Sequence, residues 1–500
     1  MQSTEKPAGD VLVVGAGPGG ATLAYALAKA GCQVMVIERG ADLSRDETLR
    51  GMPPETTAAY QTAGESERRR LSAAGGRCTD TFTNEGSGQL FVPFVGCGTG
   101  GSSSLYGMAL ERRYRHDFEG WPVSYDEMAP WYAEAERLYE VQGSPDPLRA
   151  VEAGCLAPGV PLSEANAMMF GHLESRGLHP YRQHVACRRV AGCGLCQSYL
   201  CAQAGCKRDA RTVCLEPAIA GGRVRLLAEA EVAGLEASAG HVTAAVVKHR
   251  GETLRVAARV FVVAAGALAT PRLLARSGLA QRSGLLGRRL MRHAIDLFVL
   301  ALGPRHAEAG EAKELALNDY YAMPGQMLGT VQAFGMAPTL EYLRNKPGRN
   351  LWKMLGPAAV PVARLFARAP IVAGILADEP SADNGVMDGP RGPHLRYRLG
   401  ALDQNRRLQL RRRILRAFAR YGPVRVFGTS ELPALGHVCG TAMFGERPEN
   451  SVLDRYNRVH EMENLYVTDA SFFPTSGGVN PALTVMANAL RVAHHLEAVL

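Results

Sequence analysis

The sequence predicts an α/β fold in which a Rossmann-type dinucleotide-binding domain is joined to a discontinuous α+β domain. Three observations near the start of the chain support this prediction. Residues 11–14 form a short β-branched run, typical of a buried parallel strand, and the glycine-rich turn 15–20 follows at once. A helical stretch over 21–30 stops at a glycine, and a second strand over 33–37 ends in Glu38. Together these segments form the first β–α–β unit of a dinucleotide fold.

Each small residue of the turn has a physical role in this interpretation. Gly15 makes the tight turn, Gly17 lets a pyrophosphate lie against the backbone, and Gly20 lets the helix pack close to the strand. The helix N-terminus offers free N–H groups to the phosphates. Glu38 is placed to accept hydrogen bonds from the adenosine ribose hydroxyls, which disfavours NADP because its 2′-phosphate would meet an acid.

Composition and charge exclude several classes of protein. The chain has 500 residues, of which 46% are hydrophobic and 21% charged, as in ordinary globular proteins. The net charge is +8, and Arg runs occur at 68–70 and 411–413. Solvated helix faces explain these runs better than a nucleic-acid surface does, because no nucleic-acid-binding motif accompanies them. The sequence also lacks a G-x-S-x-G elbow, an H-E-x-x-H motif and a P-loop, which argues against a hydrolase, a zinc protease and a P-loop NTPase.

No segment of the sequence has the pattern of an export signal or a membrane span. Residues 1–10 are polar, and no uncharged apolar run reaches the length of a spanning helix. We therefore expect a cytoplasmic protein with no membrane span and no nucleic-acid partner. The apolar stretch 354–377 is interrupted by arginines and prolines, and we interpret it as part of a substrate pocket or lid, with a monotopic membrane contact as the alternative.

A second glycine cluster lies at 96–108. Its residues include Gly98, Gly101, Ser102 and Tyr106. A flexible linker is the simple interpretation, but the aromatic and apolar residues in the cluster favour a backbone loop pressed against a planar cofactor. A helix over 129–139 follows, with a capping box at its start.

The middle of the chain alternates between strands and turns. Strands are expected at 224–227, 242–248, 254–257 and 260–264, before a helix that starts at Thr270-Pro271. Residues 296–430 contain short β-like pieces and a basic amphipathic helix at 404–420, without glycine loops of the nucleotide-binding type. This region is the best candidate for a separate substrate domain.

Motifs return at the C-terminal end of the chain. A strand over 464–469 ends in Asp469, and Pro481 opens a helix after Asn480. Asn480 is either the cap of this helix or a group that hydrogen-bonds a substrate at its positive end. His437 lies 43 residues before Asn480, and the residues alone do not separate a structural from a catalytic histidine.

Together these motifs resemble the glucose–methanol–choline (GMC) family of FAD-dependent alcohol oxidoreductases. The motifs that carry the resemblance are Gly15–Glu38, the 96–108 loop, Trp121-Pro-Val-Ser-Tyr-Asp, Ala264-Ala265-Gly266 with Thr270-Pro271, Gly284-Leu-Leu-Gly287, Asp378-Glu-Pro, and His437-x-x-Gly-Thr with Asn480-Pro481. The resemblance implies three FAD-binding segments (1–150, 205–295 and 435–500) and two substrate-domain segments (151–204, with the Cys-rich stretch, and 296–434).

The resemblance also implies site residues. His437 and Asn480 match the two polar groups that the family places over the flavin N5 side. Ala265, Pro481 and Asp469 are implied near the flavin, and Val232 at the adenine. Tyr106 stands where many family members have Asn. The identity of the electron acceptor, oxygen or a redox partner, is therefore left open.

The expected reaction is oxidation of CH–OH to C=O by hydride transfer to flavin N5. His437 would be the general base and Asn480 would donate a hydrogen bond to the developing alkoxide. The expected substrate is a polar small molecule, such as a sugar or aminosugar hydroxyl in a secondary-metabolite pathway. A bulky apolar alcohol such as a sterol or long-chain alcohol is the alternative, and a NAD-dependent dehydrogenase or a non-catalytic flavoprotein subunit are further ones.

Six of the eleven cysteines are concentrated in a short segment. They are Cys187, Cys193, Cys196, Cys201, Cys206 and Cys214. The spacing of Cys193, Cys196, Cys201 and Cys206 is compatible with an iron–sulfur cluster, a tetrahedral zinc site, or thiols and a local disulfide without a metal. The sequence leaves these three interpretations open.

Overall fold

The fold is built around a five-stranded parallel sheet. The computed structural model describes residues 5–7, 9–43, 50, 51, 54, 57–149, 155–190, 193, 198–203, 205–304, 313–322, 327–336, 361, 366–390, 392–428 and 436–500. The sheet has the order β21 (Leu465–Val467), β13 (Val260–Val263), β2 (Val11–Val14), β3 (Val34–Ile37) and β9 (Val224–Leu227). The predicted strands at 11–14, 33–37, 224–227, 260–264 and 464–469 are therefore confirmed, and so is the α/β fold class.

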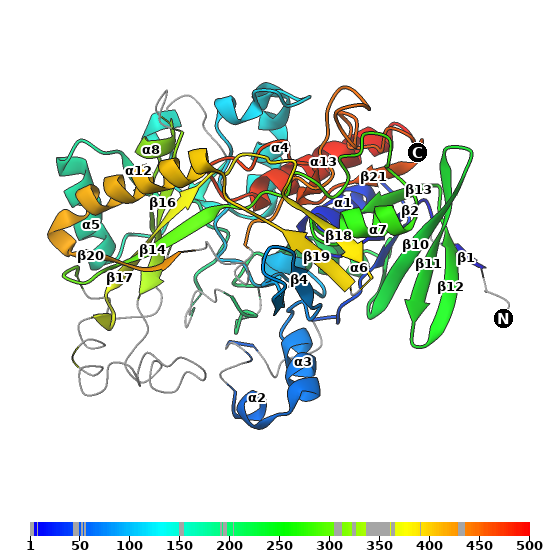
Figure 1. The fold of residues 1–500 in the computed structure, drawn as a ribbon, viewed down its shortest axis with the longest axis horizontal. Helices are drawn as coiled ribbons and strands as arrows, with labels where there is room; N and C mark the ends of the chain where they lie inside the picture. The colour runs from blue at the N-terminus through cyan, green and yellow to red at the C-terminus, as the bar shows by residue number, and fades with distance from the viewer. Residues whose placement is uncertain are drawn as a thin grey trace.

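Helices cover this sheet on the side of the first glycine turn. They are α1 (Pro18–Lys29), α13 (Ala482–Glu497) and α4 (Tyr125–Leu138), and α13 packs against the other two (Figure 1). The predicted capping box of α4 is present, since the backbone N–H of Glu127 donates to Ser124 Oγ at 3.2 Å and the Ser124 N–H donates to Glu127 Oε2 at 2.9 Å. The helix begins directly after this cap, four residues before the predicted start at 129.

A second, mainly antiparallel sheet extends from the first domain. Its order is β1 (Glu5–Pro7), β12 (Glu252–Ala257), β11 (His241–His249) and β10 (Ala230–Ser238). The sequence analysis missed β10 because the strand is irregular. Its register against β11 shifts between Val232 and Gly234 and again between Glu236 and Ala237, so that the period-2 pattern of a strand is broken.

The second domain contains a six-stranded antiparallel sheet. Its order is β20 (Pro423–Gly428), β14 (Ala294–Leu300), β17 (Pro370–Leu376), β16 (Gly329–Met336), β15 (Leu315–Leu317) and β8 (Pro180–Arg182). Helix α12 (Ala401–Ala417) covers one face of this sheet, and α5 (Glu164–Ser175) packs beside it (Figure 1). Because β8 and α5 come from 151–204, that segment contributes to the second domain, in agreement with the discontinuous domain that the sequence predicts.

A small sheet and several short elements complete the described fold. The small sheet has the order β18 (Gly385–Gly389), β19 (Gly392–Arg396), β4 (Phe82–Asn84) and β5 (Leu90–Phe91), and thus joins distant parts of the chain. The other elements are α2 (Ala58–Thr62), α3 (Glu65–Ala74), η2 (Gly101–Ser104), η3 (Arg115–Phe118), β6 (Gln142–Gly143), η4 (Pro147–Arg149), β7 (Ala157–Pro158), η5 (Arg211–Leu215), α6 (Glu216–Ala220), α7 (Thr270–Arg276), α8 (Asp319–Ala322), η7 (Ala419–Tyr421) and η8 (Ala470–Phe472).

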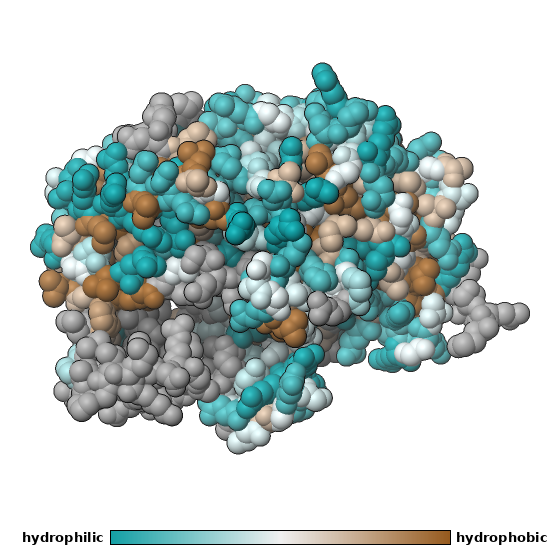
Figure 2. Space-filling view, viewed as in Figure 1, coloured by the Kyte–Doolittle hydropathy of each residue, from teal (hydrophilic) through white to brown (hydrophobic). Residues whose placement is uncertain are grey.

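The two Arg runs lie on helices and form ion pairs there. Arg69 and Arg70 on α3 pair with Glu65 and Glu67 of the same helix at 2.8 and 2.7 Å. On α12, Arg411 pairs with Asp296 of β14 at 2.6 Å. Figure 2 shows a largely hydrophilic surface over α12, with apolar residues between the polar ones. The Arg runs are therefore helix-face residues, as the solvated-face interpretation predicts.

Within the apolar stretch 354–377, the structure describes residue 361 and residues 366–377, and the rest lies outside the described residues. Its described end, β17, is an inner strand of the six-stranded sheet and carries Ile375 into the main cavity. None of the helices in the part of the chain that the structure describes has the length and hydropathy needed to cross a bilayer.

Candidate active site

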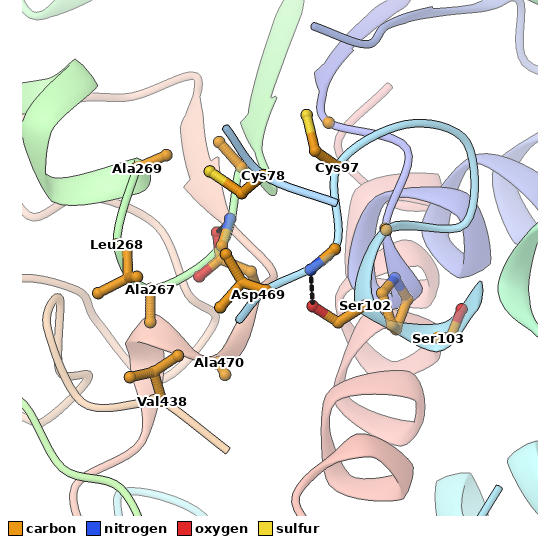
Figure 3. Close-up of a pocket in the computed structure, with 18 of the residues that line it drawn as sticks. Cys78, Cys97, Ser102, Ser103, Ala267, Leu268, Ala269, Val438, Asp469 and Ala470 are labelled. Carbon is orange, nitrogen blue, oxygen red and sulfur yellow. Dashed lines mark hydrogen bonds between the residues drawn. The ribbon is translucent and has the colours of Figure 1, made fainter. Parts of the chain in front are cut away.

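A cavity of about 950 Å³ lies where the two domains meet. The loops that line it from the first domain follow the carboxyl ends of the parallel strands β2, β3, β13 and β21, which is where open α/β sheets bind their ligands. Figure 3 shows Ser102 and Ser103 on one side of this cavity and Ala267, Leu268 and Val438 on the other. The predicted residues that line it are Gly15, Gly17, Glu38, Gly101, Ser102, Tyr106, Val232, Ala265, His437, Asp469, Asn480 and Pro481.

The two glycine-rich loops pack against one another at the cavity wall. A Cβ on Gly101 would come within 2.8 Å of the Gly17 Cα, so the contact requires glycine. Gly15 has a φ of +105°, and a Cβ there would lie 2.4 Å from the carbonyl oxygen of Ala264. A side chain at either position would therefore push the neighbouring backbone segments apart.

Gly20 and Gly98 are behind the cavity wall and do not line it. A Cβ on Gly20 would lie 2.1 Å from the carbonyl oxygen of Gly15, which is the close packing of helix on strand that the sequence predicts. Gly98 donates its backbone N–H to Glu38 Oε1 at 3.1 Å. These two residues therefore support the site without facing its ligand.

Glu38 connects three loops through its carboxylate. The Oε2 atom accepts from the Ala16 N–H at 2.9 Å, and Oε1 accepts from the N–H groups of Gly40 and Gly98 at 2.8 and 3.1 Å. The side chain also faces the cavity, so its oxygens have lone pairs available to ligand hydroxyls. Glu38 thus holds the first turn and the second glycine loop in register around the binding channel.

Asp469 also connects neighbouring loops through its carboxylate, on the other side of β13. It follows β21, and its Oδ2 accepts from the Gly266 N–H at 2.8 Å while its Oδ1 accepts from the Ser471 N–H at 2.8 Å. The hydroxyl groups of Thr270 and Ser471 donate to it as well. Burial raises the pKa of Asp469, although these hydrogen bonds oppose the shift. The network fixes the 264–270 turn, which brings Ala265 to the cavity.

Tyr106 and Val232, both predicted to contact the cofactor, line the cavity. The Tyr106 hydroxyl donates to the carbonyl oxygen of Arg208 at 2.7 Å, which fixes the ring beside the cavity. Val232 lines the cavity from β10. Ser102 Oγ accepts from the Gly96 N–H at 3.0 Å, the bond drawn in Figure 3, and so closes its own loop.

His437 is held at the cavity by a constrained backbone. Its φ is +61°, a region that costs a residue other than glycine about 1–3 kcal/mol and that persists only when the surrounding structure enforces it. Paired hydrogen bonds between Met291 and Cys439, at 2.9 and 3.0 Å, hold the two neighbouring segments together. This pairing brings His293, two residues beyond Met291, against His437.

The contact between His293 and His437 determines which ring nitrogen carries a proton. His293 Nε2 lies 2.7 Å from the Gly477 carbonyl oxygen, which only accepts, so Nε2 of His293 bears the hydrogen. A neutral His293 then has an accepting Nδ1, which lies 2.8 Å from Nδ1 of His437. His437 must therefore donate from Nδ1, and its Nε2 carries the lone pair, which accepts from Asn480 Nδ2 at 3.4 Å.

The electrostatics keep both rings neutral. Burial lowers the pKa of His437 well below 6.5, and the nearby His293 and Lys313 lower it further. Burial also lowers the pKa of His293 to about 4, against the opposing effect of its bond to Gly477. At neutral pH, His437 is thus an uncharged base.

Asn480 completes the polar end of the cavity. Its Oδ1 accepts from Gln332 Nε2 at 2.7 Å, and its Nδ2 lies 3.4 Å from His437 Nε2. Helix α13 begins at Ala482, one residue later than predicted, with Pro481 in the cap position and no side-chain capping bond. Asn480 is therefore not the cap of this helix, which removes one of the two interpretations of Asn480.

The second domain supplies the remaining wall of the cavity. Ile295, Leu297, Phe334 and Ile375 come from β14, β16 and β17 and make this wall largely apolar. Lys313 also lines it, with Nζ 4.3 Å from the centre of the Phe334 ring. Burial lowers the pKa of Lys313 to about 8, so the side chain stays mainly charged at neutral pH.

The structure brings together only some of the cysteines that the sequence predicts to form one site. The sulfur atoms of Cys187, Cys193 and Cys206 form one group, and Cys201 packs against it. Cys187 was not in the predicted four-cysteine set, and Cys196 lies outside the described residues. Cys214 is elsewhere, with its sulfur 3.3 Å from the Tyr139 hydroxyl.

One cavity combines a glycine-rich turn, an acid after the second strand and a buried neutral base. This combination is typical of a dinucleotide-dependent oxidoreductase. Models of the family described as GMC oxidoreductase match residues 10–295 and 415–489, so the chain belongs to the GMC oxidoreductase family. It is accordingly an FAD-dependent enzyme that acts on alcohol groups, as the sequence predicts. The described residues fit FAD, because Gly15, Gly17 and Gly101 line the cavity with bare backbone that a pyrophosphate can approach, and Glu38 lines it beside them.

Relatives of known name match almost the whole chain. The 6'''-hydroxyparomomycin C oxidase of Streptomyces lividus is 29% identical over 98% of this chain and 92% of its own length. The paromamine 6'-oxidase of Streptomyces fradiae is 28% identical over 97% and 90%. Among solved structures, the pyridoxine 4-oxidase from "Mesorbium loti" superposes with a TM-score of 0.67 at 19% identity, covering 97% of this chain and 98% of that one, which supports the fold.

Three residues of this site were missed by the sequence analysis. Lys313 and Gln332 reach the cavity or its polar end from the second domain, and His293 reaches it from the residue before β14; none of the three lies within a motif that the sequence predicts. The only available signal was that polar residues stand among apolar ones, as Gln332 does within β16. Such a signal becomes specific only after the two domains are placed together.

Proposed function

We propose that this enzyme oxidises a CH–OH group to C=O and that His437 accepts the hydroxyl proton. The observation that carries the proposal is the tautomer of His437, whose Nε2 carries its lone pair at the cavity and accepts only a long contact of 3.4 Å from Asn480 Nδ2. A general base must present a lone pair within hydrogen-bond reach of the proton that it removes. Deprotonation of the alcohol favours release of a hydride from the same carbon.

The chain's own residues divide the remaining tasks. FAD, when bound, supplies the acceptor for the hydride. Gly15, Gly17, Gly101 and Glu38 would hold its dinucleotide part, and the turn fixed by Asp469 would lie near the flavin. Asn480, with its oxygen already occupied by Gln332, presents its N–H groups to the oxygen that loses the proton.

The proposed substrate is a polar small molecule such as a sugar or aminosugar hydroxyl in a secondary-metabolite pathway. Its support is the likeness over the whole chain to oxidases named for paromamine and a paromomycin compound. The polar groups His437, Asn480 and Lys313, which meet at one end of the cavity, are suited to a molecule with several hydroxyls.

Lys313 narrows this substrate class. A buried ammonium next to the reacting end repels a second ammonium and hydrogen-bonds oxygen acceptors. We therefore propose that the part of the substrate nearest Lys313 carries neutral oxygen groups, and that any amino group of an aminosugar lies at a distance from it.

A bulky apolar alcohol is the second candidate. The apolar wall of Ile295, Leu297, Phe334 and Ile375 is the observation that favours it. A sterol or long-chain alcohol would leave the Lys313 ammonium buried without an oxygen partner, which is costly. For this reason we rank the polar substrate first.

Anaerobic flavin reduction tests the two candidates directly. The purified, FAD-loaded enzyme would be mixed with neutral sugars, aminosugars, small diols, a sterol and a long-chain alcohol, and bleaching of the flavin bands recorded. We expect bleaching by members of the sugar group. Bleaching by only the sterol or the long-chain alcohol would reverse the ranking, and bleaching by none of the alcohols would favour a non-catalytic flavoprotein subunit.

A further inference from the structure

Three cysteine sulfurs form a compact group next to the cofactor cavity. The Sγ atoms of Cys187 and Cys193 are 3.7 Å apart, those of Cys187 and Cys206 are 3.6 Å apart, and those of Cys193 and Cys206 are 3.2 Å apart. Cys187 and Cys206 are buried and Cys193 is half-buried. No role in the oxidation of an alcohol requires this group.

The separations match one chemical arrangement better than the others. They exceed the S–S bond length of about 2.05 Å, so the three sulfurs are not joined as disulfides. Thiolates that share a single tetrahedral Zn²⁺, each about 2.3 Å from the ion, lie about 3.8 Å from one another. At most two thiolates of a common iron–sulfur cluster share one iron, so three sulfurs that are all this close to one another fit a single ion better than a cluster.

The chain turns sharply between Cys187 and the rest of the cysteine segment. Arg189 has a φ of +45°, in the left-handed region that residues other than glycine rarely adopt. Backbone amides of this turn lie at the sulfur group, since the Arg189 N–H donates to Cys187 and the Val190 N–H donates to Cys206. Such amide contacts orient the sulfur atoms toward one another.

The two strands that carry the cysteines are fixed to each other. Cys187 and Lys207 form an antiparallel bridge, and the Arg188 N–H donates to the Cys206 carbonyl oxygen at 2.9 Å. The geometry of Cys187 and Cys206 is thus set by the backbone before any ion binds, and Cys193 closes the group from the intervening loop.

We propose that Cys187, Cys193 and Cys206 bind a single thiophilic metal ion of the Zn²⁺ type. On binding, three S–H bonds break, three metal–sulfur bonds form, and the protons pass to solvent, with no change of oxidation state. A further donor completes the tetrahedron, and Cys201, which packs against the group, is the candidate among the described residues.

The position of this site gives the ion a structural role at the cofactor cavity. The sulfur group packs directly against Tyr106 and Met108 of the second glycine loop. Ser198, which lies between Cys193 and Cys206 in the sequence, also lines the cavity and donates its N–H to the Leu105 carbonyl oxygen at 2.7 Å. The ion would therefore fasten the cysteine segment to the loop that covers the cofactor.

Metal analysis of the purified full-length enzyme tests the proposal. We expect about one zinc per chain after purification in metal-free buffers, and cobalt substitution should produce the ligand-field absorption of a tetrahedral thiolate site at wavelengths beyond the flavin bands. The Cys187→Ser and Cys206→Ser variants should lose at least nine-tenths of the metal, and Cys32→Ser, on a different part of the chain, should keep it.

The wild-type protein alone is sufficient to overturn the proposal, even if a variant fails to fold. Iron with acid-labile sulfide in place of zinc would show a cluster and contradict a single ion. A chain that contains neither metal and does not bind added zinc or cobalt would show ordinary thiols. If the site is as we propose, a chelator should lower the melting temperature and FAD retention together, and added zinc should restore both.

Discussion

Nδ1 of His293 lies 2.8 Å from Nδ1 of His437, and one proton occupies the space between them. Because His293 is tied to the Gly477 carbonyl through its other nitrogen, that proton belongs to His437. The arrangement turns the second nitrogen of His437 toward the cavity as an acceptor. His293 is thus a positioning residue for the base, in the sense that it selects the base's tautomer.

Replacing His293 should slow the enzyme without removing its cofactor. His293→Leu leaves the His437 N–H without a buried acceptor, and a loss of roughly 1–3 kcal/mol corresponds to a rate about 5–150-fold lower. His293→Gln, whose carbonyl can accept and whose amide can donate, should recover much of the rate. Stopped-flow flavin reduction measures both, with the exposed His241→Gln as the control. Equal rates in His293→Leu and the wild type would refute the tautomer argument.

The pH dependence of the rate and of stability should follow the lowered histidine pKa values. Because the pKa of His437 lies well below 6.5, flavin reduction should not lose rate as the pH falls from 8 to 6. Between about pH 6.5 and pH 4, His293 binds a proton in the unfolded chain but not in the folded protein. The free energy of unfolding should therefore decrease as the pH is lowered through this range, by roughly 3 kcal/mol for this residue. Denaturant unfolding of the wild type and His293→Gln would measure the difference. A rate that halves near pH 6.5 would contradict the shift of His437.

Asn480→Ala should separate catalysis from helix capping. The side chain makes no capping bond to α13, so its loss removes no cap, and the stability cost comes from the buried Gln332 amide, which loses its acceptor, at about 1–3 kcal/mol. The rate should fall, by about 10²–10³-fold if the amide stabilises the developing negative charge. Gln332→Leu should show a smaller loss of the same kind, because it frees the Asn480 amide to rotate. A loss of about 1 kcal/mol in stability with an unchanged rate would restore the capping interpretation.

Lys313→Met should change substrate preference. Without the buried ammonium, KM for neutral sugars should rise and substrates with an amino group near the reacting carbon should improve, a shift in relative kcat/KM of about tenfold or more. The pKa of His437 should rise as well, because Lys313 lowers it. The exposed Lys248→Met is the matched control. An unchanged preference would place Lys313 away from the bound substrate.

The sequence was most informative where chemistry requires a particular residue at a fixed spacing. The turn at Gly15, Gly17 and Gly20 and the acid at Glu38 could be predicted because a phosphate channel admits few alternatives. His293 and Lys313 could not, because their roles depend on how the second domain meets the first. The irregular strand β10 was missed for a local reason, since two register shifts remove its alternating pattern. The contact of Cys187 with Cys193 and Cys206 likewise depends on a backbone bridge that spacing does not reveal.

The central claim is that His437 takes the proton of the alcohol, and single-turnover flavin reduction in His437→Ala tests it most directly. The variant should keep FAD and its melting temperature, because His437 lies at the substrate end of the cavity and not at the glycine loops. Its rate of flavin reduction by an established substrate should be about 10²–10⁴-fold lower than that of the wild type, the usual effect of losing a general base. An unchanged rate in a variant that still holds FAD would show that another group removes the proton.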